Sequence, residues 1–306
     1  MSLSRRSVGA MQIVVSAVCF GLLGIFGKQA FAEGITPGEL LSIRFTIASL
    51  VLWGFVLITQ PRILSLNKRQ ITACAVLGIF GYALFTSLYF EALVFLSASL
   101  TVLLLYTFPI IVTFGAWVLF KERISFAQIL ALPIVTFGLA LLLSGENNVT
   151  AWQGVALGLL SAIGYSAYVL GSSRLLRSTN ALAAGLLIMT FATLTMIFRS
   201  PPDVSKIVNY TASTWIAIFG LALVSTVVAM IMFLKGLEKL TNAEASMLST
   251  IEPLTAAILA TIVLGERLSV IQIAGGALVL SGLVASSFRF TKQQSESPQR
   301  NLSVNS

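Results

Sequence analysis

The feature that most constrains this chain is a succession of long apolar runs separated by short polar connections. A run of about 20 residues is what an α-helix needs to cross the hydrocarbon core of a bilayer. Ten such runs cover residues 8–30, 38–59, 70–91, 97–120, 126–144, 151–174, 181–199, 212–234, 242–264 and 269–288. The pattern predicts an all-α integral membrane protein with ten transmembrane helices in contact with the lipid bilayer.

The composition supports a membrane protein over a soluble one. Of the 306 residues, 57% are hydrophobic and 10% are charged, whereas soluble domains hold about 25% charged residues. The connections, such as Gly34-Ile35-Thr36-Pro37, are too short for a soluble domain, and the polar segment 291–306 is predicted to be a disordered cytoplasmic tail. Arg5-Arg6 before the first run also resembles a signal peptide, but the repeat described below needs this run as a span.

The charged and reactive side chains exclude several classes of function. The net charge is +8, but the cations stand singly or in pairs between apolar runs, so no nucleic-acid partner is expected. The chain has no histidine and only one aspartate, Asp203, and it lacks a Gly-x-Ser-x-Gly motif. Cys19 and Cys74 lie inside apolar runs and are interpreted as small apolar side chains. We therefore expect no enzyme activity, no metal site and no cofactor.

The chain repeats itself after 144 or 145 residues. Pro109 is followed 13 residues later by Glu122-Arg123, as Pro253 is by Glu266-Arg267. The other matched pairs are Gly9 with Gly154, Ser16 with Ser161, Ala17 with Ala162, Phe20 with Tyr165, and Leu96 with Leu240. These matches predict two units of five spans, residues 1–147 and 148–290.

Because five is an odd number, the second unit must be inverted in the membrane. With both termini in the cytoplasm, 14 of the 19 cations lie on the cytoplasmic side, as the positive-inside rule requires. These are Arg5, Arg6, Arg62, Lys68, Arg69, Lys121, Arg123, Arg174, Arg177, Lys235, Lys239, Arg289, Lys292 and Arg300. Inverted repeats are typical of secondary transporters, which bind substrate near the midplane. A channel is a remote alternative because no filter sequence is visible, and so is a membrane protein without transport activity.

Two segments carry a resemblance to a known family. They are EPLTAAILATIVLGERLS (Glu252 to Ser269) and its first-half counterpart ALVFLSASLTVLLLYTFPI (Ala92 to Ile110). With the five-plus-five organisation, they resemble the EamA type of the drug/metabolite transporter superfamily over nearly the whole chain. Within it the chain looks most similar to YddG-type bacterial amino-acid exporters.

This resemblance implies a secondary transporter of the bacterial inner membrane. It would export amino acids, aromatic and other neutral ones, by alternating access. The cavity is expected among the first, third, fourth, sixth, eighth and ninth spans. A cationic drug, a sugar or a nucleotide-sugar is the alternative cargo, and no obligatory protein partner is evident.

Aromatic side chains recur at helical spacing in these spans. Tyr82, Phe85 and Tyr89 are three and four residues apart, which places them on one helix face. A buried tyrosine hydroxyl needs a polar partner, and a wet cavity would supply one. The candidate substrate-binding residues are Phe20, Tyr82, Phe85, Tyr89, Tyr106, Phe108, Tyr165, Tyr168, Ser249 and Glu252. Packing between helices is the alternative for all the rings, as is an interfacial aromatic belt for Tyr89.

Two charges lie well inside apolar spans, where an ionised group is costly and often functional. Glu252 precedes Pro253, which cannot donate to the carbonyl of Ser249, and the repeat places Phe108 where Glu252 stands. Glu252 could contact a substrate ammonium, carry a coupling proton, or support a kink as a structural carboxyl. Proton coupling and uniport both remain open. Arg44 is expected to snorkel or to pair structurally, with binding of a substrate carboxylate as the alternative, and Glu266 is expected to serve a loop or interface.

Overall fold

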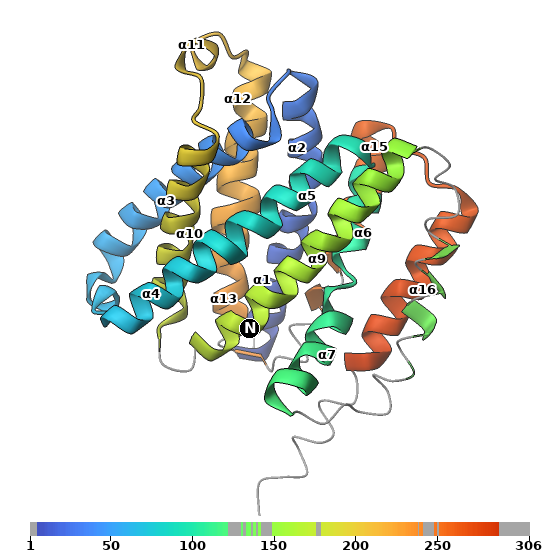
Figure 1. Ribbon diagram of the computed structural model, residues 1–306, viewed down its shortest axis with the longest axis horizontal. Coiled ribbons are helices and arrows are strands. Elements are labelled where there is room, and N and C mark those ends of the chain that lie inside the picture. The colour runs from blue at the N-terminus through green and yellow to red at the C-terminus, as the bar shows by residue number, and fades with distance from the viewer. Residues whose placement is uncertain are drawn as a thin grey trace, which may run out of the picture.

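The computed structural model describes residues 5–121, 130, 133–135, 137–138, 140–141, 149–175, 179–237, 239–240, 248–249 and 251–287. Within these residues the regular structure is helical and there is no strand (Figure 1). Seven helical stretches are long and apolar enough to cross a membrane, and Ile251–Leu264 and Val270–Gly282 are shorter apolar helices. The predicted all-α membrane fold is confirmed. Most of the predicted span 126–144 lies outside the described residues.

The first half contains four described spans. The first is α1 (Arg5–Gly21) with α2 (Leu23–Ala32), and the second is α3 (Pro37–Thr59), which the short helix η1 (Pro61–Leu64) follows. The third runs through α4 (Lys68–Val76), the π-helix η2 (Leu77–Ala83) and α5 (Leu84–Phe95). The fourth is α6 (Ala98–Leu105) with α7 (Phe108–Phe120). The first and fourth spans, predicted as continuous, are therefore interrupted at Leu22 and at Tyr106-Thr107.

The second half has a matching order. It contains α9 (Val149–Leu175), α10 (Ala181–Arg199) and the short α11 (Val204–Ile207). The eighth span runs through α12 (Ala212–Phe219), the π-helix η3 (Gly220–Val228) and α13 (Ala229–Leu237). The last described spans are α15 (Ile251–Leu264) and α16 (Val270–Ser287). The two π-helices overlap at the 144-residue offset, so the repeat extends to this uncommon backbone geometry.

Local sequence explains where several helices begin. The Thr36 hydroxyl accepts from the backbone N–H of Glu39, and Pro37 occupies the first turn of α3, where its missing N–H does no harm. Asn67 and Gln70 form a reciprocal capping box at α4. Helix α6 ends at Leu105 and α7 begins at Phe108, directly before Pro109. The proline nitrogen has no proton to donate to a helical hydrogen bond.

Matched glycine contacts relate the two halves. A Cβ on Gly9 of α1 would lie 2.8 Å from the Cβ of Lys239, and one on Gly154 of α9 would lie 2.8 Å from the Cβ of Phe95. Lys239 and Phe95 occupy equivalent positions in the repeat. Each half therefore packs its first helix against the end of the other half's third span, at glycines that permit close approach.

The same relation appears in two hydrogen bonds. The hydroxyl of Ser16 donates to the carbonyl oxygen of Ala229 at 2.7 Å, and that of Ser161 donates to the carbonyl oxygen of Phe85 at 2.9 Å. The partners are equivalent at offsets of 145 and 144 residues. In Figure 1, α1 begins on the side marked N, here called the N-terminal face, and α9 begins on the other side, here called the opposite face. The second half is thus inverted.

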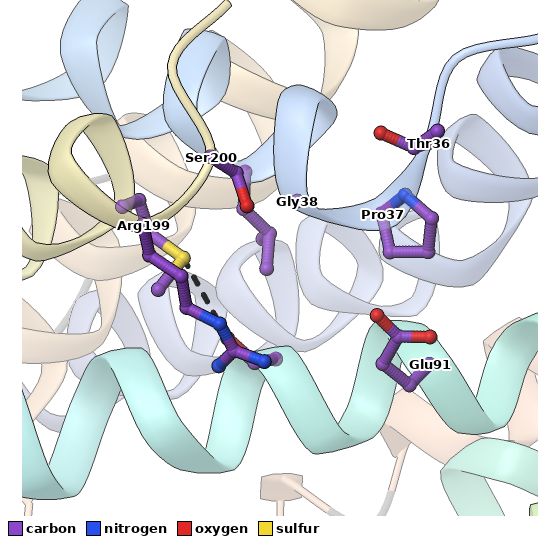
Figure 2. A pocket seen from close by; sticks show the side chains of 9 residues that line it. Thr36, Pro37, Gly38, Glu91, Arg199 and Ser200 are labelled. Carbon is purple, nitrogen blue, oxygen red and sulfur yellow. Dashed lines mark hydrogen bonds between the residues drawn. The ribbon is translucent and has the colours of Figure 1, made fainter.

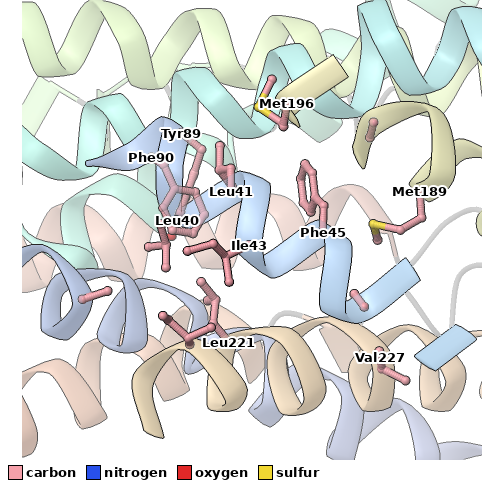
Figure 3. Close-up of a cluster of buried hydrophobic side chains, with 14 of the residues drawn as sticks. Leu40, Leu41, Ile43, Phe45, Tyr89, Phe90, Met189, Met196, Leu221 and Val227 are labelled. Atoms are coloured by element: carbon pink, nitrogen blue, oxygen red, sulfur yellow. The ribbon is translucent and has the colours of Figure 1, made fainter. Parts of the chain in front are cut away.

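The main apolar core lies between α3, α5, α10 and η3 (Figure 3). Phe45 and Phe90 are fully buried in it. On the outside, Ile58, Phe198 and Val270 are 84%, 93% and 82% exposed. Apolar side chains exposed to this extent on many helices form a surface suited to lipid rather than to water.

Candidate functional site

Six of the predicted site residues form one continuous cluster of rings, here called the ring cluster. It consists of Tyr82, Phe85, Tyr106, Phe108, Tyr165 and Tyr168. The ring centroids of Phe108 and Tyr165 are 4.6 Å apart, and those of Phe85 and Tyr165 are 4.8 Å apart. The cluster thus joins the third and fourth spans of the first half to the sixth span, which opens the second half.

Small residues allow the helices that carry these rings to approach. A Cβ on Gly81 would lie 3.2 Å from the ring of Tyr168, and one on Gly164 would lie 3.1 Å from the Cβ of Phe85. Tyr82 lies in the π-helix η2, a geometry with a wider turn than the α-helix. Its ring contacts Phe85 and Tyr168, with centroids 5.2 and 5.7 Å away.

Tyr106 links the ring cluster to the ninth span. It lies at the interruption between α6 and α7, and its hydroxyl donates toward the carbonyl oxygen of Ser249 at 2.9 Å and Oε2 of Glu252 at 2.8 Å. The carbonyl of Ser249 is the one that Pro253 deprives of its helical donor, so the tyrosine compensates for the proline. Tyr106, Ser249 and Glu252, all predicted site residues, therefore meet at the boundary between the halves.

The remaining two predicted residues lie apart from the ring cluster. Tyr89 is only 5% exposed and contacts Phe90, with ring centroids 5.5 Å apart, so the alternative of an exposed aromatic belt is wrong for it. Phe20 is half-buried at the end of α1 and makes no ring contact within the described part of the chain. Its neighbour Gly21 packs against α15, where an added Cβ would lie 3.0 Å from the carbonyl oxygen of Glu252.

Arg44 does not snorkel, so that part of the expectation is wrong. Its side chain is 1% exposed in the core. Nε donates to the hydroxyl of Thr226 at 2.8 Å, and the guanidinium carbon lies 5.3 and 5.4 Å from the ring centroids of Phe45 and Phe90. Arg44 lies seven residues after the first residue of α3. It is buried because α3 is surrounded there by α5, α10 and η3.

Glu266 has a defined structural role that its place at a span end did not reveal. Its carboxylate accepts from the backbone N–H of Ala98 at 2.6 Å, and from the N–H and hydroxyl of Ser99 at 3.2 and 2.9 Å. These are the free N–H groups of the first turn of α6, where a negative charge is favourable. The recurring Glu-Arg pair was the available sequence signal.

Further hydrogen bonds join the halves on the opposite face. The Ser42 hydroxyl donates to the carbonyl oxygen of Ser200 at 2.7 Å, and the Tyr210 hydroxyl donates to Oε1 of Glu39 at 2.9 Å. Desolvation, together with this bond to Glu39, raises the pKa of Tyr210. With the Glu266 contact, these bonds hold the opposite face together.

A cavity of about 180 Å³ lies between α3, α5 and α10 on the opposite face. Figure 2 shows Glu91 and Arg199 among the residues that line it. The full lining is Thr36, Pro37, Gly38, Leu41, Ser87, Glu91, Met196, Arg199 and Ser200. None of these belongs to the ring cluster, so this cavity is separate from the predicted site.

Helical spans in two inverted repeats, with polar and aromatic groups meeting at their boundary, define a multi-pass membrane protein built like a secondary transporter. The chain belongs to the EamA-like transporter family, whose model matches residues 7–144 and 152–288.

Similar proteins agree with this assignment. The chain is 27% identical over 283 residues to the "uncharacterized transporter YcbK" of Bacillus subtilis, covering 89% of this chain and 90% of the relative. It is 25% identical to the "uncharacterized inner membrane transporter YicL" of Salmonella typhimurium, covering 90% of this chain and 94% of the relative. One solved crystal structure shares the fold, with a TM-score of 0.66 at 18% identity, covering 94% of this chain and 98% of that one. The protein is thus a membrane transporter with bacterial relatives.

Proposed function

We propose that this transporter exports amino acids, aromatic and other neutral ones, across a bacterial inner membrane by alternating access. The observation that carries the proposal is the contact of Tyr106 with Ser249 and Glu252, where the ring cluster of the third, fourth and sixth spans meets the ninth span. Ring faces suit apolar and aromatic side chains, and a carboxylate beside them suits an ammonium group. The neighbouring half-buried tyrosines supply polar atoms for a polar substrate.

The hydrogen bonds on the opposite face support a transporter that is closed on that side. Glu266 holds α6, and the Tyr210–Glu39 bond holds α12 to α3. We propose that the N-terminal face is cytoplasmic, because the cation count favours that orientation. In this state substrate reaches the site from the cytoplasm, and release requires the opposite face to part.

The role of Glu252 bears on the coupling mechanism. A phenol carries one proton, so Tyr106 cannot donate fully to both Ser249 and Glu252. A protonated Glu252 would donate to Tyr106 and leave the tyrosine proton for the carbonyl of Ser249. Glu252 is thus suited to carry a coupling proton or to accept a substrate ammonium in exchange for that proton.

The test is counterflow in proteoliposomes loaded with unlabelled substrate, using labelled phenylalanine, leucine, a sugar and an organic cation. We expect the amino acids to exchange and the sugar and the cation to stay outside. Exchange of the sugar or the cation, without exchange of any amino acid, would show that the proposed class of cargo is wrong. The cation is included because a carboxylate among aromatic rings also suits cationic drugs.

The same vesicles test coupling when a pH gradient is imposed. If Glu252 carries the proton, the gradient drives wild type but not Glu252→Gln. Glu91→Gln is the matched control, because Glu91 lines the separate cavity on the opposite face, and it should respond as wild type does. A wild type that ignores the gradient would instead establish uniport.

A further inference from the structure

Among the described residues, no carboxylate balances the charge of the buried Arg44. The side chain is 1% exposed, and Nη1 has no hydrogen-bond partner among them. The hydrogen bond from Nε to Thr226 reaches a neutral hydroxyl, and no described carboxylate lies within ion-pair distance. Buried charges in proteins are normally paired, because removal from water is costly. Phe45 and Phe90 give weak cation–π support but no counter-charge.

Arg44 stands at a position where the two repeats carry different residues. At the 144-residue offset Ile188 holds the position of Arg44, so the second half has no equivalent charge. Thr226 and Tyr82 are equivalent residues of the π-helices η3 and η2, and these elements flank α3. π-Helical segments occur often at functional sites. Beside Thr226, the buried hydroxyl of Ser225 also lacks a partner.

Contacts connect Arg44 to the ring cluster and to Glu252. Phe45, which flanks the guanidinium, contacts Tyr82 of the ring cluster with ring centroids 5.4 Å apart. On the other flank, Phe90 contacts Tyr89. The ring cluster in turn reaches Glu252 through the hydrogen bond of Tyr106. A continuous series of aromatic contacts therefore connects the surroundings of Arg44 to Glu252. In the core view, Tyr89 and Phe90 lie next to each other, and Phe45 lies farther along α3 (Figure 3).

We propose that Arg44 is the anion subsite of the transport site and binds the carboxylate of the substrate. The proposal rests on the proposed function and sharpens it, because it requires a carboxylate on the cargo and excludes neutral sugars and simple organic cations. The unpartnered Nη1 donates to the carboxylate. Arg44 is closed off in the present state, so the carboxylate enters when the helices around Arg44 move apart.

Binding of labelled L-phenylalanine to the purified protein tests this subsite by displacement. The probes are unlabelled L-phenylalanine, 3-phenylpropionate, which lacks the ammonium, and 2-phenylethylamine, which lacks the carboxylate. Wild type should bind the carboxylate-bearing probes at least about tenfold more tightly than the amine, or about 1.4 kcal/mol. Arg44→Gln should remove that preference and leave the affinity for the amine nearly unchanged.

Two further variants distinguish a loss of carboxylate binding from a folding defect. Arg199→Gln makes the same change at an exposed arginine outside the ring cluster and should keep the wild-type preference. Arg44→Lys keeps the charge and should retain part of the preference for carboxylates. If Arg44→Gln weakens all probes equally, or weakens none, the subsite is refuted and Arg44 is structural.

The outcomes also separate this subsite from the amino-acid cargo. If 3-phenylpropionate binds through Arg44 but no amino acid does, the anion subsite stands and the cargo proposal fails. If L-phenylalanine binds and Arg44→Gln has no selective effect, the cargo stands and the subsite fails. If no carboxylate-bearing probe binds to wild type, whether displacement is followed with labelled L-phenylalanine or with labelled 3-phenylpropionate, the subsite is refuted.

Discussion

At the scale of single residues, the boundary between the halves depends on the hydroxyl of Tyr106. It donates toward the carbonyl oxygen of Ser249, which Pro253 leaves without a helical donor, and toward Glu252 near the middle of the ninth span. The carboxylate has no counterpart in the first half, where Phe108 stands instead and contributes to the ring cluster. Both repeats thus supply rings but only the second supplies this carboxylate, so an inverted pair of similar halves forms an asymmetric site.

Tyr106→Phe removes this hydroxyl and keeps the ring. We expect a loss of about 1 kcal/mol of stability, seen as a fall of about 2–4 °C in thermal unfolding, together with slower counterflow. Tyr165→Phe is the matched control for stability, because the Tyr165 hydroxyl makes no hydrogen bond within the described residues while its ring packs on Phe85 and Phe108. Equal losses of stability in the two variants would contradict a specific role for the Tyr106 hydroxyl.

At the scale of helices, the halves are held together by equivalent contacts of their first helices. Ser16 of α1 bonds to Ala229 beside η3, and Ser161 of α9 bonds to Phe85 beside η2. Both bonds are received by carbonyls just after a π-helix. Each π-helix thus lies just before the residue that contacts the first helix of the other half.

Ser16→Ala and Ser161→Ala should therefore destabilise the protein equally. Hydrogen bonds between transmembrane helices contribute about 0.6 kcal/mol on average, and each variant should lose a similar amount in unfolding titrations. Ser281→Ala serves as a control, because that exposed hydroxyl bonds only within its own helix. Clearly unequal losses at Ser16 and Ser161 would show that the two interfaces are not energetically equivalent.

Much of this element-level organisation could be predicted from the sequence. The offset that matches Gly9 with Gly154 and Ser16 with Ser161 also matches the residues that they contact. A repeat preserves the neighbours of each equivalent position. Ring spacing placed Tyr82, Phe85 and Tyr89 on one helix face, but only Tyr82 and Phe85 join the ring cluster, since spacing fixes a helix face and not the neighbour it meets. The π-helices and the burial of Arg44 depend on packing between distant segments and left no local signal. For Glu266 the repeated Glu-Arg pair was a signal, but it did not identify the contact with α6.

At the scale of the whole molecule, the account describes two inverted halves with a substrate site between them. The opposite face is held together by Glu266 on α6 and by the Tyr210–Glu39 bond. Polar contacts of this kind can be exchanged for water when the halves move. Transport then requires the rim contacts of the opposite face to break and form in each cycle.

Cross-linking across that rim tests this central claim most directly. Ser99→Cys and Glu266→Cys place two thiols where the wild-type side chains touch at 2.9 Å, and the native Cys19 and Cys74 are buried. A reducible bifunctional thiol reagent should stop counterflow of labelled L-phenylalanine in the double variant while leaving its binding intact, and reductant should restore transport. Each single variant, treated alike, should keep its untreated rate. Counterflow that continues undiminished with the cross-link in place would contradict alternating access through this face.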